Sequence, residues 1–325
     1  MSNGYGTIKV FATNSGRTIA SLICKKLSIP LGKARVKKFK DGEVDVQILE
    51  NVRDHDVYIV VSLHPEADNF FEAIWLASAA KQSSAARVSY VITYMGYARA
   101  DRKSAGRTPV GIRLAFEMLS VAKPDRMIIL DIHAEQSLSL VPNAIVDHLF
   151  ASIVLVPVLK ESLQSNVFVV ASPDKGGAVR AMAYAKFLGK DDFVILSKSR
   201  PKPGEVDEDS IMIIGEVKDR TVVFVDDMID TGGSMIAGAK AVMKAGATGV
   251  VVCVTHALFS DHARKKFQEC DAIQAVYVTD SVNSLLPETL QDYSKINTVT
   301  VSGLLASAIR RTHDGQSLSE LIISM

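Results

Sequence analysis

Two adjacent aspartates followed by a glycine-rich turn form the most informative segment of the chain. Residues 221–235 read TVVFVDDMIDTGGSM, so an apolar run leads directly into Asp226 and Asp227. Carboxylates at a strand end can accept hydrogen bonds from neighbouring hydroxyls of a ribose. Successive N–H groups in a turn at a helix N-terminus can bind a phosphate. The segment therefore predicts a ribose phosphate site, against the alternative of an acidic turn with a Ser/Thr cap. The turn consists of Asp230, Thr231, Gly232, Gly233 and Ser234.

A second candidate lies in LSKSRPKPG, residues 196–204. Lys198 and Arg200 are two residues apart, so an extended segment would point both side chains the same way. From these residues alone, a solvated basic loop is the favoured explanation.

The elements that must position these residues are predicted from short apolar runs, many of them rich in Val and Ile. Continuous rather than alternating hydrophobicity is typical of strands covered on both faces, as in parallel sheets. Helical patterns at 109–122 and 233–247 lie between such runs, so we expect an α/β fold. In parallel sheets, ligands bind beyond the carboxyl ends of the strands. The runs include residues 57–63, 88–95, 127–132, 167–172, 193–197, 221–227, 249–256 and 275–280.

The length of 325 residues predicts two domains, because single hydrophobic cores stop growing near 250–300 residues. Both halves carry the same strand–helix rhythm, so we expect two similar domains, each a parallel sheet flanked by helices. The expected bounds are 7–149 and 150–302, with a C-terminal helix at about 303–320 that packs back on the first domain.

The composition excludes some classes of function. A net charge of +1 leaves no general electrostatic attraction for nucleic acid. No apolar run reaches the roughly 18 residues of a membrane span, and no signal peptide is evident. Three scattered cysteines fit a reducing compartment. We therefore expect a cytoplasmic protein without nucleic acid or membrane partners.

The segment VVFVDDMIDTGGS resembles the phosphoribosyl diphosphate-binding loop shared by type I phosphoribosyltransferases and phosphoribosyl diphosphate synthetases. Four further segments are similar to the synthetases: FKDGEVDVQI, GYARADRKSAGRTP, LDIHAEQ and SPDKGGAVRA. The resemblance implies a ribose-phosphate diphosphokinase, which transfers the β,γ-diphosphoryl group of ATP to the C1 hydroxyl of ribose 5-phosphate. It also implies that Lys198 and Arg200 are catalytic.

The same resemblance implies an ATP site. Phe39 would stack on adenine while Asp41 and Glu43 accept hydrogen bonds, and alternation in an extended segment would put all three on one side. In the family this segment reaches in from a neighbouring subunit, so we expect a homo-oligomer built from dimers, possibly a hexamer. The remaining ATP contacts would come from Arg99, Arg102 and His133.

Magnesium is the implied cofactor. His133 and Asp174 are the candidate ligands by resemblance, although a lone histidine after a strand is more often structural. Asp131 precedes His133 by two residues, so strand alternation would place both on one side, and its carboxylate suits magnesium. The alternative role for Asp131 is to cap a neighbouring turn.

The chain departs from the family pattern in several places. Ala100 stands where the family has glutamine in its nucleotide site, which leaves donor choice open. Residues 62–69 and 137–148 differ where the main class binds regulatory phosphate and ADP, so phosphate activation and ADP inhibition are open too. Two other functions remain: a non-catalytic synthetase-associated subunit and a phosphoribosyltransferase.

Overall fold

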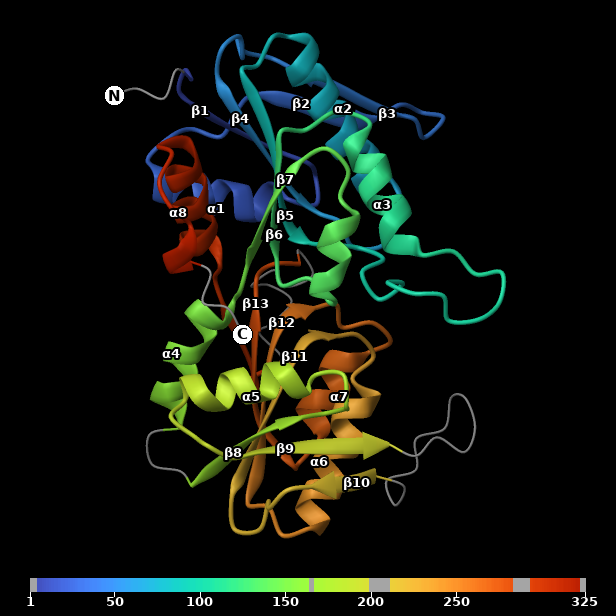
Figure 1. The fold of residues 1–325 in the computed structure, drawn as a ribbon, viewed down its shortest axis with the longest axis vertical. Coiled ribbons are helices and arrows are strands. Elements are labelled where there is room, and N and C mark those ends of the chain that lie inside the picture. The colour runs from blue at the N-terminus through green and yellow to red at the C-terminus, as the bar shows by residue number, and fades with distance from the viewer. Residues whose placement is uncertain (1–4, 164–166, 199–210, 283–292, 322–325) are drawn as a thin grey trace. The chain divides into compact units, whose positions relative to one another are not determined.

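The computed structural model describes residues 5–163, 167–198, 211–282 and 293–321. The chain forms two compact units, which are treated separately below. The first unit contains residues 1–150, 281–283 and 301–323, and the second contains most of residues 151–300. Helix α8 near the C-terminus therefore belongs to the same unit as the N-terminal strands (Figure 1).

The first unit is built on a five-stranded sheet in the order β1-β4-β5-β6-β7, with all neighbours parallel. Its central strands are buried along almost their whole length, because helices cover both faces. The strands are β1 (Ile8–Ala12), β4 (Asp56–Ser62), β5 (Arg87–Tyr94), β6 (Arg126–Leu130) and β7 (Ile145–Leu149). The helices are α1 (Arg17–Leu27), α2 (Asp68–Gln82), α3 (Gly111–Ser120), α8 (Ser302–His313) and the 3₁₀ turns η1 (Glu135–Leu140) and η4 (Ser319–Leu321).

A separate antiparallel hairpin lies after α1. It consists of β2 (Ala34–Lys38) and β3 (Val44–Ile48). The partly buried Val36, Val46 and Ile48 pack against the core of the first unit. The hairpin turn at residues 39–43 is exposed to solvent.

The second unit has a seven-stranded sheet in the order β10-β9-β8-β11-β12-β13-β14. Its strands are parallel except for β10, which pairs antiparallel with β9 at the edge of the sheet. The strands are β8 (Phe168–Ser172), β9 (Phe193–Lys198), β10 (Ile211–Ile214), β11 (Thr221–Ile229), β12 (Gly249–Ala257), β13 (Ile273–Thr279) and β14 (Ile296–Val299). The helices are α4 (Ser152–Ser162), α5 (Ala178–Phe187), α6 (Gly233–Lys244) and α7 (Ala263–Glu269).

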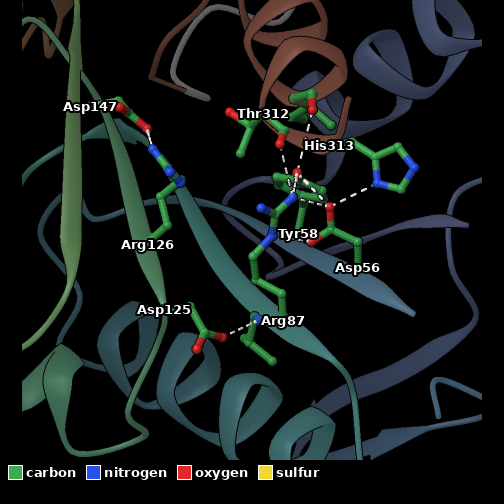
Figure 2. A network of polar contacts seen from close by, with 10 residues as sticks. Asp56, Tyr58, Arg87, Asp125, Arg126, Asp147, Thr312 and His313 are labelled. Atoms are coloured by element: carbon green, nitrogen blue, oxygen red, sulfur yellow. Dashed lines mark hydrogen bonds and ion pairs between the residues drawn. The ribbon is translucent and has the colours of Figure 1, made fainter. Parts of the chain in front are cut away.

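A buried carboxylate holds the last turn of α8 against the first unit's sheet (Figure 2). Asp56 is 0% exposed and accepts bonds from Arg87 Nε at 2.8 Å and from the Tyr58 hydroxyl at 2.8 Å. His313 Nδ1 lies 2.9 Å from the same carboxylate, and Arg87 donates to the Thr312 carbonyl at 3.1 Å. Because a buried charge needs several partners, this network fixes α8 on β4 and β5.

Candidate active site

The carboxylates predicted to bind ribose lie inside β11. The strand continues past Asp226 and Asp227 to Ile229, so they are in the strand rather than at its end. Asp227 is buried, while the Asp226 side chain is 22% exposed. Strands β8 and β11 are parallel neighbours, so the loop after β8 emerges beside these carboxylates.

An arginine that the sequence analysis did not assign lies against both aspartates. Nη1 of Arg180 is 3.2 Å from Oδ1 of Asp226 and 3.1 Å from Oδ1 of Asp227. Arg180 is in the first turn of α5, and its side chain is only 14% exposed. The sequence did hold a signal for this contact. Arg180 comes three residues after Gly177, where α5 begins, and the first turn of such a helix lies close to the neighbouring strand.

The charges at this site are unbalanced. Burial raises the pKa of Asp226 well above its ordinary value, and the Asp227 carboxylate adds to this effect. Arg180 opposes the rise, while Asp174 contributes to it more weakly. Asp226 and Asp227 thus share the Arg180 guanidinium, with Asp174 adding negative potential nearby, and such a site favours hydroxyl donors or a cation.

The loop after β8 is closed by its own polar groups. Oδ1 of Asp174 accepts hydrogen bonds from the N–H groups of Gly176 at 2.8 Å and Gly177 at 3.2 Å. The Ser172 hydroxyl donates to the Asp174 carbonyl at 2.6 Å. A Cβ on Gly177 would lie 2.6 Å from the Ser172 hydroxyl oxygen and 3.9 Å from Asp226 Oδ1. A side chain at 177 would therefore displace the Ser172 hydroxyl at the end of β8, while Asp226 lies at ordinary contact distance.

The predicted phosphate-binding turn, residues 230–234, follows β11 and leads into α6. Gly232 has a φ of +73°, and a Cβ there would lie 2.4 Å from Cε2 of Phe267. Helix α6 begins at Gly233. The first N–H groups of a helix lack acceptors within it and can bind an anion.

The first unit carries the other predicted residues. Strand β6 ends at Leu130, and Asp131 has a left-handed φ of +38°. Its N–H donates to the Leu149 carbonyl at 2.8 Å. The expectation that strand alternation aligns Asp131 with His133 is therefore wrong, because the strand has already ended. Asp131 is buried and His133 is exposed.

The segment predicted to hold adenine is a hairpin turn rather than an extended strand. The N–H of Phe39 donates to the Glu43 carbonyl at 2.8 Å, and the N–H of Glu43 donates to Asp41 Oδ1 at 3.1 Å. Side chains do not alternate between two faces across such a turn. The prediction that alternation places Phe39, Asp41 and Glu43 on one side is therefore wrong. All three side chains are exposed, as are Arg99 and Arg102 in the segment between β5 and α3.

The proposed metal ligands are divided between the units. Within residues 5–163, 167–198, 211–282 and 293–321, no three His, Cys, Asp or Glu side chains gather into a metal-holding group. Asp131 and His133 belong to the first unit and Asp174 to the second. Lys198 is the last residue of β9, and only its backbone is described. Its side chain and the whole of Arg200 lie outside the described residues.

Comparison with known proteins decides the family. Residues 8–122 match the N-terminal domain of ribose phosphate pyrophosphokinase, and residues 190–323 match a phosphoribosyl synthetase-associated domain. A ribose-phosphate pyrophosphokinase of Haemophilus influenzae is 42% identical over 97% of this chain and 98% of its own length. The chain belongs to the ribose-phosphate pyrophosphokinase family. The resemblance found in the sequence is thereby confirmed, since pyrophosphokinase and diphosphokinase name the same activity.

Two further members of the pyrophosphokinase family support this assignment. The Agrobacterium fabrum relative is 40% identical over 97% of this chain and 99% of its own. The crystal structure of phosphoribosylpyrophosphate synthetase from Mycobacterium smegmatis superimposes with a TM-score of 0.88, at 28% identity, covering 95% of this chain and 100% of that one. The predicted fold of parallel sheets flanked by helices is confirmed. No helix among the described residues is both long and apolar enough to cross a membrane.

Proposed function

We propose that this protein is an ATP-dependent diphosphotransferase. It transfers the β,γ-diphosphoryl group of ATP to the C1 hydroxyl of ribose 5-phosphate and gives 5-phosphoribosyl 1-diphosphate and AMP. The observation that carries the proposal is the 42% identity to a ribose-phosphate pyrophosphokinase over nearly the whole of both chains. A phosphoribosyltransferase explains less, because the family match extends through both units of the chain.

Ribose 5-phosphate binds along β11 and the turn that follows. Asp226 and Asp227 accept hydrogen bonds from the two ring hydroxyls, which supply the donors that their crowded negative charge favours. The 5-phosphate lies at the turn 230–234, where the first N–H groups of α6 and the positive end of its dipole meet the anion. Ser234 keeps a hydroxyl where the family usually has threonine.

Arg180 orients the two carboxylates and offsets part of their negative charge before the sugar binds. Its Nη1 atom lies within 3.2 Å of Oδ1 of Asp226 and 3.1 Å of Oδ1 of Asp227, so losing Arg180 would remove a counter-charge that both carboxylates share. The loop of Asp174, Gly176 and Gly177 approaches the same edge of the sheet and is suited to the diphosphate that forms at C1.

Magnesium fits the donor types of the candidate ligands. Carboxylate oxygens from Asp131 and Asp174 are what this ion prefers, and His133 would contact it directly or through water. The ion would neutralise charge on the ATP phosphates. Lys198 and Arg200 would stabilise the charge that develops in transfer, while Phe39, Asp41, Glu43, Arg99 and Arg102 would hold the nucleotide.

Formation of AMP tests the proposal. Purified protein is incubated with ATP and magnesium, with and without ribose 5-phosphate, and AMP is quantified. We expect AMP only when the sugar phosphate is present. Repeating the assay with inorganic phosphate shows whether phosphate activates the enzyme despite the changes at residues 62–69 and 137–148.

A non-catalytic synthetase-associated subunit is the second candidate, favoured by Ala100 in the nucleotide segment. Folded protein that binds ATP but forms no AMP in either condition would favour it. Retention of Lys198, Arg200, Asp226 and Asp227 favours the active enzyme.

A further inference from the structure

A basic cleft in the first unit lies apart from every residue assigned above to a ligand. It runs between α1 and α8, which lie side by side (Figure 1), and has a volume of about 440 Å³. Its polar lining includes Lys26, Ser307, Arg310, Arg311 and Gln316. A volume of this size falls in the range of pockets that hold small molecules.

The spacing along α8 explains how the cleft is built. Gly303, Ser307 and Arg310 are four and then three residues apart, so they share one face of the helix. A Cβ on Gly303 would meet nothing within 4 Å, so the first turn of α8 leaves open space there. Leu27 and Ala306 contribute an apolar floor.

The charges of the cleft favour an anion. Arg311 is paired with Glu320 at 2.5 Å, so Lys26 and Arg310 carry the net positive charge. Arg310 donates one N–H to the Leu27 carbonyl at 3.1 Å, which uses one of the five donors of its guanidinium.

The end of α1 would ordinarily repel an anion, because its last carbonyls carry partial negative charge. Here those carbonyls have donors. The N–H of Ile29 binds the Cys24 carbonyl, the N–H of Ser28 binds that of Lys25, and Arg310 binds that of Leu27. Of these donors Arg310 also brings a full positive charge to the end of α1, which opposes the partial negative charge there.

We propose that this cleft binds a phosphate group, either as inorganic phosphate or as part of a small phosphorylated metabolite. Lys26 and Arg310 bind its oxygens by charge, and the hydroxyl of Ser307 and the amide of Gln316 donate hydrogen bonds at the rim. This site is distinct from the proposed substrate sites, so it stands whether or not the chain makes phosphoribosyl diphosphate.

A matched pair of charge reversals tests the proposal. Lys26→Glu removes a lining cation, whereas Lys25→Glu makes the same charge change at the adjacent residue of α1, which does not line the cleft. Binding of radiolabelled inorganic phosphate to the full chain is measured by equilibrium dialysis. We expect Lys26→Glu to remove one bound phosphate per chain, or to weaken its affinity at least tenfold, and Lys25→Glu to stay within twofold of wild type.

Two further measurements complete the test. Ser307→Glu, which adds a negative charge inside the cleft, should have the same effect as Lys26→Glu if both variants unfold at the wild-type temperature. Competition by AMP, with adenosine as the uncharged control, distinguishes a metabolite from the free ion: displacement of this phosphate by AMP alone indicates the metabolite. Equal phosphate binding in wild type and Lys26→Glu, or equal losses in Lys26→Glu and Lys25→Glu, would overturn the proposal.

Discussion

The environment of Asp226 disfavours a charged carboxylate, although its proposed role is to bind ribose hydroxyls as a carboxylate. Asp226 lies beside Asp227 in the buried strand β11, and burial raises its pKa well above the ordinary value. Arg180 offsets part of this cost through its contact at 3.2 Å. Such an arrangement lowers stability and is typical of functional sites, where carboxylates are kept for a ligand.

We expect Asp226→Asn to stabilise the protein at pH 7 by on the order of 1 kcal/mol. The raised pKa means that the unfolded chain ionises Asp226 at a lower pH than the folded chain. The free energy of unfolding of the wild type therefore falls as pH rises from the pKa of Asp226 in the unfolded chain to its higher pKa in the folded chain. The asparagine variant cannot ionise and avoids this loss. Thermal unfolding at pH 4 and pH 7 measures the effect.

The exposed Asp271→Asn is the control for that comparison and should leave the unfolding temperature nearly unchanged. The gain from Asp226→Asn should shrink at pH 4. If Asp226→Asn is less stable than wild type at pH 7, the ion pair between Asp226 and Arg180 stabilises the folded state by more than burial of the carboxylate destabilises it.

Lys198→Ala tests the proposed transition-state contact. Because that contact forms mainly as charge develops, we expect turnover to fall about 100-fold or more with nearly unchanged ATP binding. Lys202→Ala, two residues beyond the proposed catalytic pair, is the matched control and should keep wild-type turnover. If Lys198→Ala stays within a few-fold of wild type, Lys198 is not catalytic.

Gly232 is critical for the element that joins β11 to α6. Its φ of +73° and the 2.4 Å approach to Phe267 mean that any side chain there is strained. We expect Gly232→Ala to destabilise the protein by about 2 kcal/mol and to weaken ribose 5-phosphate binding. Thermal unfolding and titration with the sugar phosphate measure the two effects.

Gly233→Ala is the control within the same turn. Its Cβ would lie 4.0 Å from the Thr231 hydroxyl oxygen, and alanine favours the helix that begins there. Its stability should match or exceed that of wild type. Equal destabilisation by the two variants would mean that backbone strain at Gly232 is not the cause.

The Asp56 network predicts how strongly α8 is held to the first unit. Arg87→Met should destabilise the protein by about 3 kcal/mol, because it leaves the buried Asp56 carboxylate without its main counter-charge. Denaturant unfolding measures this. Arg113→Met, which breaks an exposed pair with Glu117, should cost about 0.5 kcal/mol or less. Similar losses in both would contradict the role given to the network.

Sequence patterns predicted the buried strands well and the polar or short elements poorly. The runs at 57–63 and 221–227 correspond to β4 and β11, since strands covered on both faces are continuously apolar. The hairpin at 34–48 went unpredicted because ARVKK and VDVQI mix charged and apolar residues. The contact of Arg180 with two aspartates was also missed, because it depends on the pairing of β8 with β11 rather than on spacing.

At the scale of the whole chain, recognition depended on several segments in order. The turn at 230–234 alone does not separate a synthetase from a transferase, whereas the segments at 39–48, 96–109, 130–136 and 172–181 do. Comparison confirmed the family and the fold. The residues that bind magnesium, and the contribution of a second subunit to the adenine site, stay predictions because a single chain does not fix them.

The central claim is that the chain transfers two phosphates together. Its most direct test follows the label from ATP that carries radioactive phosphorus at the β position, in the presence of magnesium. We predict that the label moves to the ribose product, only when ribose 5-phosphate is present, and that unlabelled AMP appears in equal amount. Labelled ADP as the product, or no ribose-dependent transfer by folded protein that binds ATP, would contradict the account.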